Sequence, residues 1–244
     1  MGLTIHYTLT APHVKNLDEA RTLVSQLHDF AATLDFQKLS DIQFIDDFAD
    51  PMLATFLGCL RPYTKDDGEE SFLQVTPIHV LMFVAEQEGS EPALFGLGLF
   101  SDTGTDVHYE SITRPSGVGN VYRLQRFCKT QFASLSTNGG WGNFLKIHDG
   151  ICQILDCARS LGVDLDVRDE SKYFTKRDPA ALRKEIDRWN QLIAAFTGRL
   201  KDHLRPGAVV AAITDAPEFE QLEAQGQQLL GDFNPADLDL DLEL

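Results

Sequence analysis

The sequence predicts an α+β fold, with a single, largely antiparallel sheet of about six or seven strands and three packed helices. Residues 3–10 alternate between apolar and polar side chains, which is the period of a strand with one buried face. Apolar residues recur at helical spacing in the segments 17–34, 143–161 and 179–203. Residues 41–133 consist of short β-rich runs separated by Gly, Pro, Asp and Ser, which favours antiparallel strands joined by turns.

The ends of the three helices carry residues that favour helix termini. Asn16 begins a capping box for the first helix, and Asn143 is the expected N-cap of the second. Gly162 follows the second helix in the place of a C-cap glycine. Asp178 is expected to cap the third helix, because Pro179 suits the first helical position.

The strands of the sheet are delimited by turn residues. Residues 78–86 and 93–100 flank a Gly- and Pro-containing turn and predict an antiparallel hairpin with two buried strands. A short strand is expected near 107–112, inside a loop rich in glycine. Residues 121–133 predict a longer strand, and 163–168 predict another, whose Asp residues point to water.

Composition and charge exclude several classes of protein. The chain of 244 residues has 37 acidic and 21 basic side chains and a formal charge of −16, which argues against nucleic-acid binding. A hydrophobic content of 43% is too high for an intrinsically disordered chain. Apolar runs stay far below the ~18 residues that a membrane-spanning helix needs, so no membrane partner is expected. The N-terminus lacks the features of a secretion signal, which predicts a cytoplasmic location.

The sequence divides into an α+β domain at 1–205 and an acidic C-terminal appendage at 206–244. The appendage contains nine acidic residues and no Lys, Arg or His, and a short helix is expected near 217–230. Its final residues, 237–244, alternate Asp or Glu with Leu. This pattern suits an extended peptide that lays its leucines on an apolar strip along a sheet edge. A solvated acidic tail is the alternative.

Two candidate site residues lie on the strand predicted at 121–133. Cys128 neighbours a lysine, but strand alternation places its thiol with the buried side chains, which predicts an inert core cysteine. Lys129 and Gln131 point to the opposite face and are candidate catalytic residues. The alternative is that this face is simply solvated.

Three further candidates belong to a predicted pocket. His148 lies on the apolar stripe of its helix, so it is either a core histidine or, in a cavity, a neutral base. Gly96 and Gly98 fall on one face of their strand and leave that patch of sheet without side-chain cover. A packed helix backbone or a bound ligand then approaches these two glycines, which makes them candidate cofactor-binding residues.

The sequence predicts neither a metal nor a cofactor. The four cysteines contain no Cys-x-x-Cys pair, and the seven histidines show no spacing typical of metal ligands. Asp164 and Asp166 form an Asp-x-Asp pair, which is a weak metal signal and is also expected on the solvated side of an edge strand.

Three groups of short motifs stand out in the chain: the opening GLTIHY at 2–7, the run FCKTQF at 127–132, and Asp169-Glu170, Tyr173 and Arg177-Asp178 before the last long helix. Together they resemble a family of uncharacterised bacterial proteins, over roughly residues 1–203. The resemblance implies a bacterial, cytosolic origin, and it brings no known activity and no catalytic residue.

Two functions follow as hypotheses, and the sequence leaves open whether the chain is an enzyme. The first is a cytosolic interaction or self-association module, which binds a protein partner or a second copy through the acidic tail or the polar face of 121–133. The second is a small-molecule enzyme or sensor, with a pocket over Gly96 and Gly98 lined by His148 and by Lys129 and Gln131.

Overall fold

The computed structural model describes residues 3–65, 68–109, 112–203, 209 and 211–230. Within these ranges the chain has six α-helices, a seven-stranded sheet and a second sheet of four strands. The paired strands of both sheets run antiparallel. The predicted α+β class is confirmed, and the four-stranded sheet is an addition to the single sheet that the sequence predicts.

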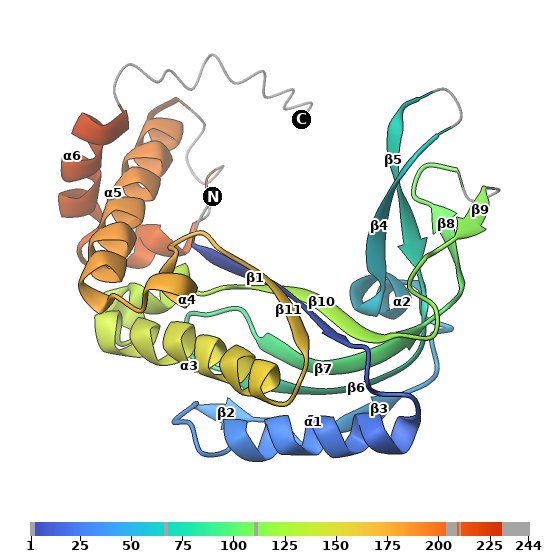
Figure 1. Cartoon of the computed structure of the whole chain (residues 1–244). Helices are drawn as coiled ribbons and strands as arrows, with labels where there is room; N and C mark the ends of the chain where they lie inside the picture. The colour runs from blue at the N-terminus through green and yellow to red at the C-terminus, as the bar shows by residue number, and fades with distance from the viewer. Residues whose placement is uncertain (1–2, 66–67, 110–111, 204–208, 210, 231–244) are drawn as a thin grey trace.

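The main sheet has the strand order β11-β1-β10-β7-β6-β2, and β3 also pairs with β6. The expected hairpin is present as β6 and β7 (Figure 1). The strands are β1 (Thr4–Ala11), β2 (Lys38–Leu39), β3 (Gln43–Ile45), β6 (Pro77–Glu86), β7 (Ala93–Phe100), β10 (Tyr122–Lys129) and β11 (Asp164–Asp169).

The ladder between β7 and β10 is short. One pair, Arg123 with Gly98, joins the two strands, whereas β1 pairs with β10 from Thr4 to Ala11. The hydroxyl of Tyr7 donates to the carbonyl of Leu94, 2.8 Å away, and so links β1 to β7 across β10. A buried side chain therefore strengthens the part of the sheet where backbone pairing is weakest.

The second sheet has the order β4-β5-β8-β9 and encloses a small core of its own. The strand expected near 107–112 is absent from the described part of that segment, because Asp106 turns the chain by accepting backbone N–H groups of His108 and Tyr109. The strands are β4 (Cys59–Thr64), β5 (Glu70–Val75), β8 (Thr103–Asp106) and β9 (Thr113–Pro115).

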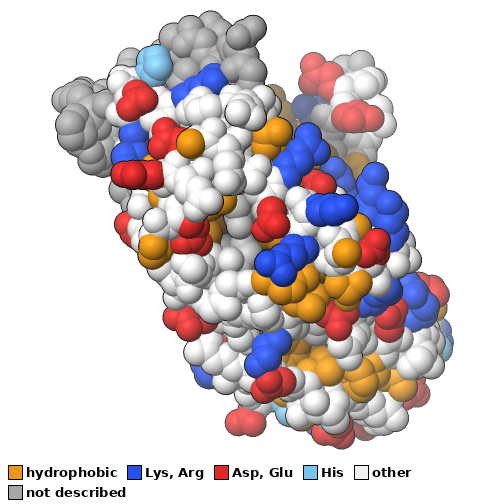
Figure 2. Space-filling view, turned by 90° about the vertical axis from the view of Figure 1, so that its left-hand side faces the viewer, with side chains coloured by type: hydrophobic (Ala, Val, Ile, Leu, Met, Phe, Trp, Pro, Cys, Tyr) orange, Lys and Arg blue, Asp and Glu red, His pale blue; other side chains and the backbone are white. Residues whose placement is uncertain are grey.

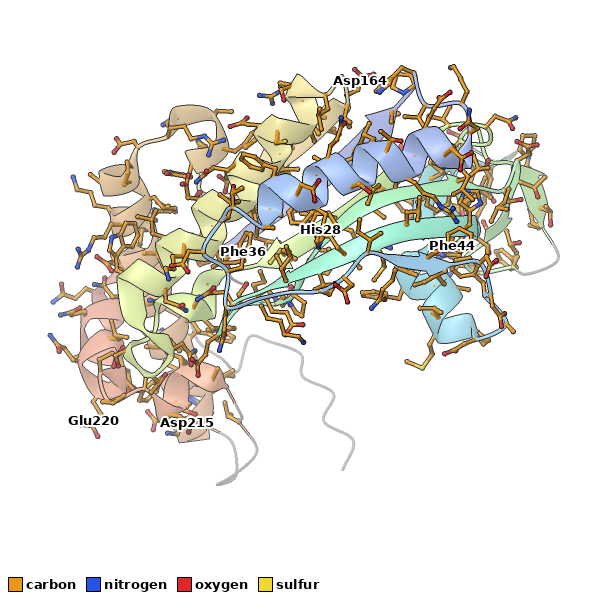
Figure 3. All side chains as sticks on the ribbon, turned by 90° about the horizontal axis from the view of Figure 1, so that it is seen from below. His28, Phe36, Phe44, Asp164, Asp215 and Glu220 are labelled. Carbon is orange, nitrogen blue, oxygen red and sulfur yellow. The ribbon has the colours of Figure 1, made fainter. Side chains whose placement is uncertain are left out.

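Helices cover one face of the main sheet. Figure 3, seen from below, shows α1 and α3 side by side across that face. On the opposite side, α5 and α6 rise at one end of the sheet, and β4 and β5 rise at the other (Figure 1). The helices are α1 (Leu17–Ala31), α2 (Pro51–Leu57), α3 (Gly140–Ser160), α4 (Tyr173–Lys176), α5 (Pro179–His203) and α6 (Phe219–Leu230).

Alternation along β1 decides which face the helices cover. Ile5, Tyr7 and Leu9 are buried, whereas His6 is exposed on the opposite face. The apolar stripe of α1 packs with these residues in one core. This face of the sheet is therefore dry, and the face that carries His6 is open.

Two helix boundaries differ from the sequence prediction. The first helix ends at Ala31, three residues before the predicted end at 34. The second begins at Gly140, so Asn143 is not its N-cap. The Asn143 amide instead donates to the carbonyl of Glu88 at 2.8 Å and anchors the turn between β6 and β7.

The predicted strand 121–133 is shorter in the structure. β10 ends at Lys129, and a short 3-10 helix, η1, covers Gln131–Ser134. Gln131 is therefore no longer on the polar face of a strand. Its side chain is wholly buried, where Oε1 accepts from the backbone N–H of Leu3 and Nε2 donates to Asn190.

The segment after α5 packs against it as far as the structure describes it. The expected short helix is present as α6, and a 3-10 helix, η3 (Ala212–Asp215), precedes it. Gly226 of α6 lies so close to α5 that an added Cβ would be 1.9 Å from the carbonyl oxygen of Gln191. The division of the chain at 205/206 stays a prediction, and the alternating segment 237–244 lies outside the described residues. Among the helices described, none has the length and apolar character that crossing a membrane requires.

Candidate functional site

A cavity of about 840 Å³ lies over the open face of the main sheet. The register of three strands brings its polar floor together, because His6 pairs with Phe127 and Arg168, and Thr8 pairs with Gln125 and Asp166. Paired residues of antiparallel strands project to the same side. The floor comprises His6, Thr8, Gln125, Phe127, Asp166 and Arg168.

Apolar side chains form a second part of the cavity. Met82 and Leu94 contribute from β6 and β7, and Phe56 and Leu60 contribute from α2 and β4. Phe56 is 62% exposed, Leu60 48% and Phe127 56%, although all three are large apolar residues. Exposed apolar groups gathered at the rim of a cavity are typical of a binding surface.

Arg126 of β10 lines the cavity beside these apolar residues. Its guanidinium carbon lies 5.3 Å from the ring centre of Phe56, and Nη1 donates to the carbonyl of Gln125 at 2.6 Å. Nε and Nη2 are buried and have no hydrogen-bond partner in the described structure. Burial lowers the pKa of this guanidinium, because the charged form is poorly solvated.

Two more arginines share the same unsatisfied state. Arg61 of β4 and Arg123 of β10 each have a buried Nε without a hydrogen-bond partner. The Cys59 thiol lies within electrostatic range of Arg61, Arg123 and Arg126. Burial raises its pKa, and the three positive charges reduce this rise without cancelling it. Within the described residues, none of these arginines forms an ion pair.

Arginines without an ion-pair partner are unexpected in a chain with 37 acidic and 21 basic residues. Figure 2 shows another side of the molecule, where basic and acidic side chains lie interspersed. Buried charges without partners are costly, and a guanidinium offers paired donors that match carboxylate and phosphate oxygens. The cavity lining combines Arg126 and Arg168 with apolar surface and with the carboxylates of Glu91 and Asp166. The arginines and the apolar surface together suit an anionic ligand with apolar groups.

The glycines predicted to lie under a ligand are not among the described residues that line this cavity. Gly96 has a φ of +153°, and an added Cβ would be 2.0 Å from the carbonyl oxygen of Leu81. At Gly98 the nearest atom would belong to the side chain of Val80, 3.1 Å away. The groups that approach both glycines are thus neighbouring parts of the sheet, and a role in binding is left as a prediction.

Lys129 and Gln131 are not among the described residues that line the cavity, although Glu91, the partner of Lys129, is. The backbone N–H of Lys129 donates to Glu91 at 3.0 Å, and its Nζ lies 3.9 Å from the same carboxylate. Gln131 is buried between the N-terminal strand and α5, as described above. The structure therefore does not bring these two side chains to one site.

His148 is wholly buried in the core, which agrees with its position on the apolar stripe of α3. Its Nδ1 lies 2.9 Å from the hydroxyl of Thr130, and its Nε2 lies 3.1 Å from the hydroxyl of Ser171. Asp169 approaches Nε2 at 3.5 Å. Both ring nitrogens thus have partners inside the protein, and His148 is not among the residues that line the cavity.

His148, Cys152 and Asp169 are close enough to hold a metal ion, since their ligand atoms lie within 4.8 Å of one another. Burial raises the pKa of the Cys152 thiol, whereas metal binding requires the thiolate. Asp169 is already engaged by the N–H groups of Ser171 and Phe174. These contacts favour a structural polar network over a metal site.

The residues that shape the cavity were missed in the sequence. Arg126 neighbours Phe127 within a predicted strand, but no spacing in the sequence relates it to Arg168 or Phe56. The one available signal was the exposed face of the strand beginning at 121, whose Gln125 and Phe127 do line the cavity. Comparison with protein-family models, with curated proteins and with solved structures gives no match for this chain.

Proposed function

We propose that this chain is a binding protein for a ligand that carries carboxylate or phosphate groups beside apolar groups, held in the cavity over the main sheet. The observation that carries the proposal is Arg126, whose Nε and Nη2 are buried without partners at the cavity. A bound anion next to this guanidinium would offset the cost of the buried positive charge.

Two further features support binding by this face. The exposed rings of Phe56 and Phe127 offer apolar contact next to the guanidinium. The buried His148–Asp169 pair is not among the residues that line the cavity, so this pair does not face a ligand there. Binding is therefore better supported than acid–base catalysis.

The setting of this function is proposed from the sequence. A bacterial, cytoplasmic origin is proposed from the motif resemblance. A protein partner or self-association through the acidic segment is the other role that the sequence predicts.

The proposal is tested with anilinonaphthalene sulfonate, a fluorescent probe that joins a sulfonate to aromatic rings. The titration uses the full chain with its last four acidic side chains neutralised (D237N, D239N, D241N and E243Q), so that they do not compete for the arginines. We expect Arg126→Ala to weaken binding about tenfold, equivalent to roughly 1.4 kcal/mol. Added salt should weaken the binding of the chain that retains Arg126.

The matched control is Arg188→Ala, which removes an exposed arginine of α5 outside the cavity lining. This variant should bind the probe like its parent. Equal affinity in the Arg126→Ala and Arg188→Ala chains, with both folded by circular dichroism, would refute the proposed site.

A further inference from the structure

The chain contains a segment whose chemistry matches the cavity. Residues 237–244, which lie outside the described residues, read Asp-Leu-Asp-Leu-Asp-Leu-Glu-Leu. In an extended conformation, alternate side chains project to opposite sides. The segment then presents four carboxylates on one side and four leucines on the other, so it is both anionic and apolar.

The cavity offers the complementary groups on neighbouring walls. Arg126 and Arg168 supply positive charge beside the carboxylates of Glu91 and Asp166. Exposed apolar surface comes from Phe56, Leu60 and Phe127. A peptide with period-two alternation can place its carboxylates toward the arginines and its leucines toward the rings. The segment carries four acidic residues and no basic residue within eight positions, so its charge complements the two arginines.

The segment begins a short distance along the chain from the described fold. α6 ends at Leu230, and six residues, 231–236, separate it from Asp237. An extended chain spans roughly 3.3–3.6 Å per residue, so these six residues bridge about 20 Å. α5 and α6 rise on the same side of the main sheet as β4 and β5, but at its opposite end (Figure 1). The segment must therefore extend across the sheet to reach the cavity, and the fourteen residues 231–244 span up to about 48 Å when extended.

We infer that residues 237–244 dock in this cavity within the same chain and compete with other anionic ligands for Arg126. The inference rests on the proposed function and names the first occupant of that site. It makes the binding protein self-inhibited, since an external ligand must displace the chain's own acidic peptide.

The test is a double-mutant cycle between Arg126 and the C-terminal carboxylates, read out by the affinity for anilinonaphthalene sulfonate. The four full-length chains are the parent, the tail-neutral chain (D237N, D239N, D241N and E243Q), Arg126→Ala, and the combination. Neutralising the tail should raise the probe's affinity at least fivefold when Arg126 is present. The same neutralisation should have less than a twofold effect when Arg126 is alanine.

A matched control removes the same number and kinds of charge elsewhere. The variant D164N, D187N, D215N and E220Q changes four exposed residues outside the cavity lining, three of which are labelled in Figure 3. Its probe affinity should stay within twofold of the parent. An equal gain in this control and in the tail-neutral chain would show a general charge effect and overturn the inference.

A synthetic peptide of residues 235–244 provides the positive test in trans. It should displace the probe from the tail-neutral chain but not from the combined variant. A control peptide of the same composition, with its acidic residues in one block and its leucines in another, should compete more weakly. Equal probe affinity in the parent and tail-neutral chains would overturn the docking while leaving the proposed site intact, provided that Arg126→Ala still weakens binding. If the parent's apparent affinity for the probe falls as protein concentration rises, and sedimentation shows dimers, the segment docks in the cavity of a second copy. That result would overturn docking within one chain.

Discussion

The carboxylate of Asp169 lies 3.5 Å from Nε2 of His148, and both side chains are almost wholly buried. The two residues come from β11 and α3, so their contact ties an edge strand to the helix that covers it. The hydroxyl of Ser171 donates to Asp169 at 2.7 Å, and the N–H of Phe174 donates at 2.8 Å. The carboxylate of Asp169 therefore holds in place the loop that joins β11 to α4.

Replacing this carboxylate should reduce stability in a pH-dependent way. Burial by itself raises the pKa of Asp169. Hydrogen bonds from His148, Ser171 and Phe174 outweigh this effect and bring the pKa down to about 2. The folded pKa is thus below the unfolded value of ~3.9, so the stabilisation is complete above about pH 5 and is lost as the pH falls through 2. We expect Asp169→Asn to cost about 2 kcal/mol at pH 7, measured by urea denaturation.

The difference between parent and Asp169→Asn should shrink as the pH is lowered toward 2. Asp164→Asn is the control, because Asp164 is an exposed residue of the same strand. Its stability should match that of the parent across the series. A constant difference between parent and Asp169→Asn from pH 7 to pH 2 would contradict the assigned pKa.

The buried hydroxyl of Tyr7 should contribute measurably to the joint between β7 and β10. Tyr7→Phe leaves the carbonyl of Leu94 without this donor, which should cost about 1–3 kcal/mol in urea denaturation. Tyr109→Phe makes the same chemical change at an exposed ring and should leave stability unchanged. If the two variants are equally stable, the hydrogen bond across β10 is not a stabilising contact.

The close approach of α6 to α5 depends on Gly226. In Gly226→Ala the new methyl group would overlap the carbonyl of Gln191, so the helices must move apart. Overpacking of this kind costs typically about 1–3 kcal/mol, and we expect a lower midpoint in thermal denaturation. Gly142→Ala in α3 meets open space and should raise the midpoint slightly, because alanine favours helix. A higher midpoint for both variants would show that α6 does not pack as described.

Cysteine reactivity should follow burial. Burial raises the pKa of the Cys128 thiol to about 12, and Cys157 is the cysteine with partial exposure. Because the thiolate is the reactive form, iodoacetamide at pH 8 should label Cys157 at least tenfold faster than Cys128 in the folded protein. Unfolding in urea should remove this difference, as mass spectrometry of the labelled peptides would show. Rapid labelling of native Cys128 would contradict its place in the core.

The sequence predicted those parts of the fold that depend on local periodicity. The helix at 179–203 was predicted with its correct bounds, because Asp178 and Pro179 mark its start and the apolar stripe is long. The four-stranded sheet was missed because its short strands, separated by turns, look the same in sequence whether they join one sheet or two. The pairing of β4 with β5 depends on contacts that local patterns do not encode.

The candidate site was harder to predict for the same reason. His148 was correctly placed on the apolar side of its helix, since a helix face follows from spacing alone. Gln131 was misplaced because the chain leaves β10 at Lys129, and no turn residue marks that point. Phe56 and Arg126, which both line the cavity, are distant in sequence and come together only in the folded chain.

By itself, the sequence determined the α+β class, the long helices, the hairpin and the acidic character of the chain. These properties follow from side-chain period and composition, which act over a few residues at a time. Tertiary structure alone decided which face of the main sheet stays open, that Arg126 lines the cavity with unpartnered donors, and that Lys129 and His148 do not share a site. Strand order and the packing of distant segments set those relationships, because residues far apart in the chain meet only when the whole core forms.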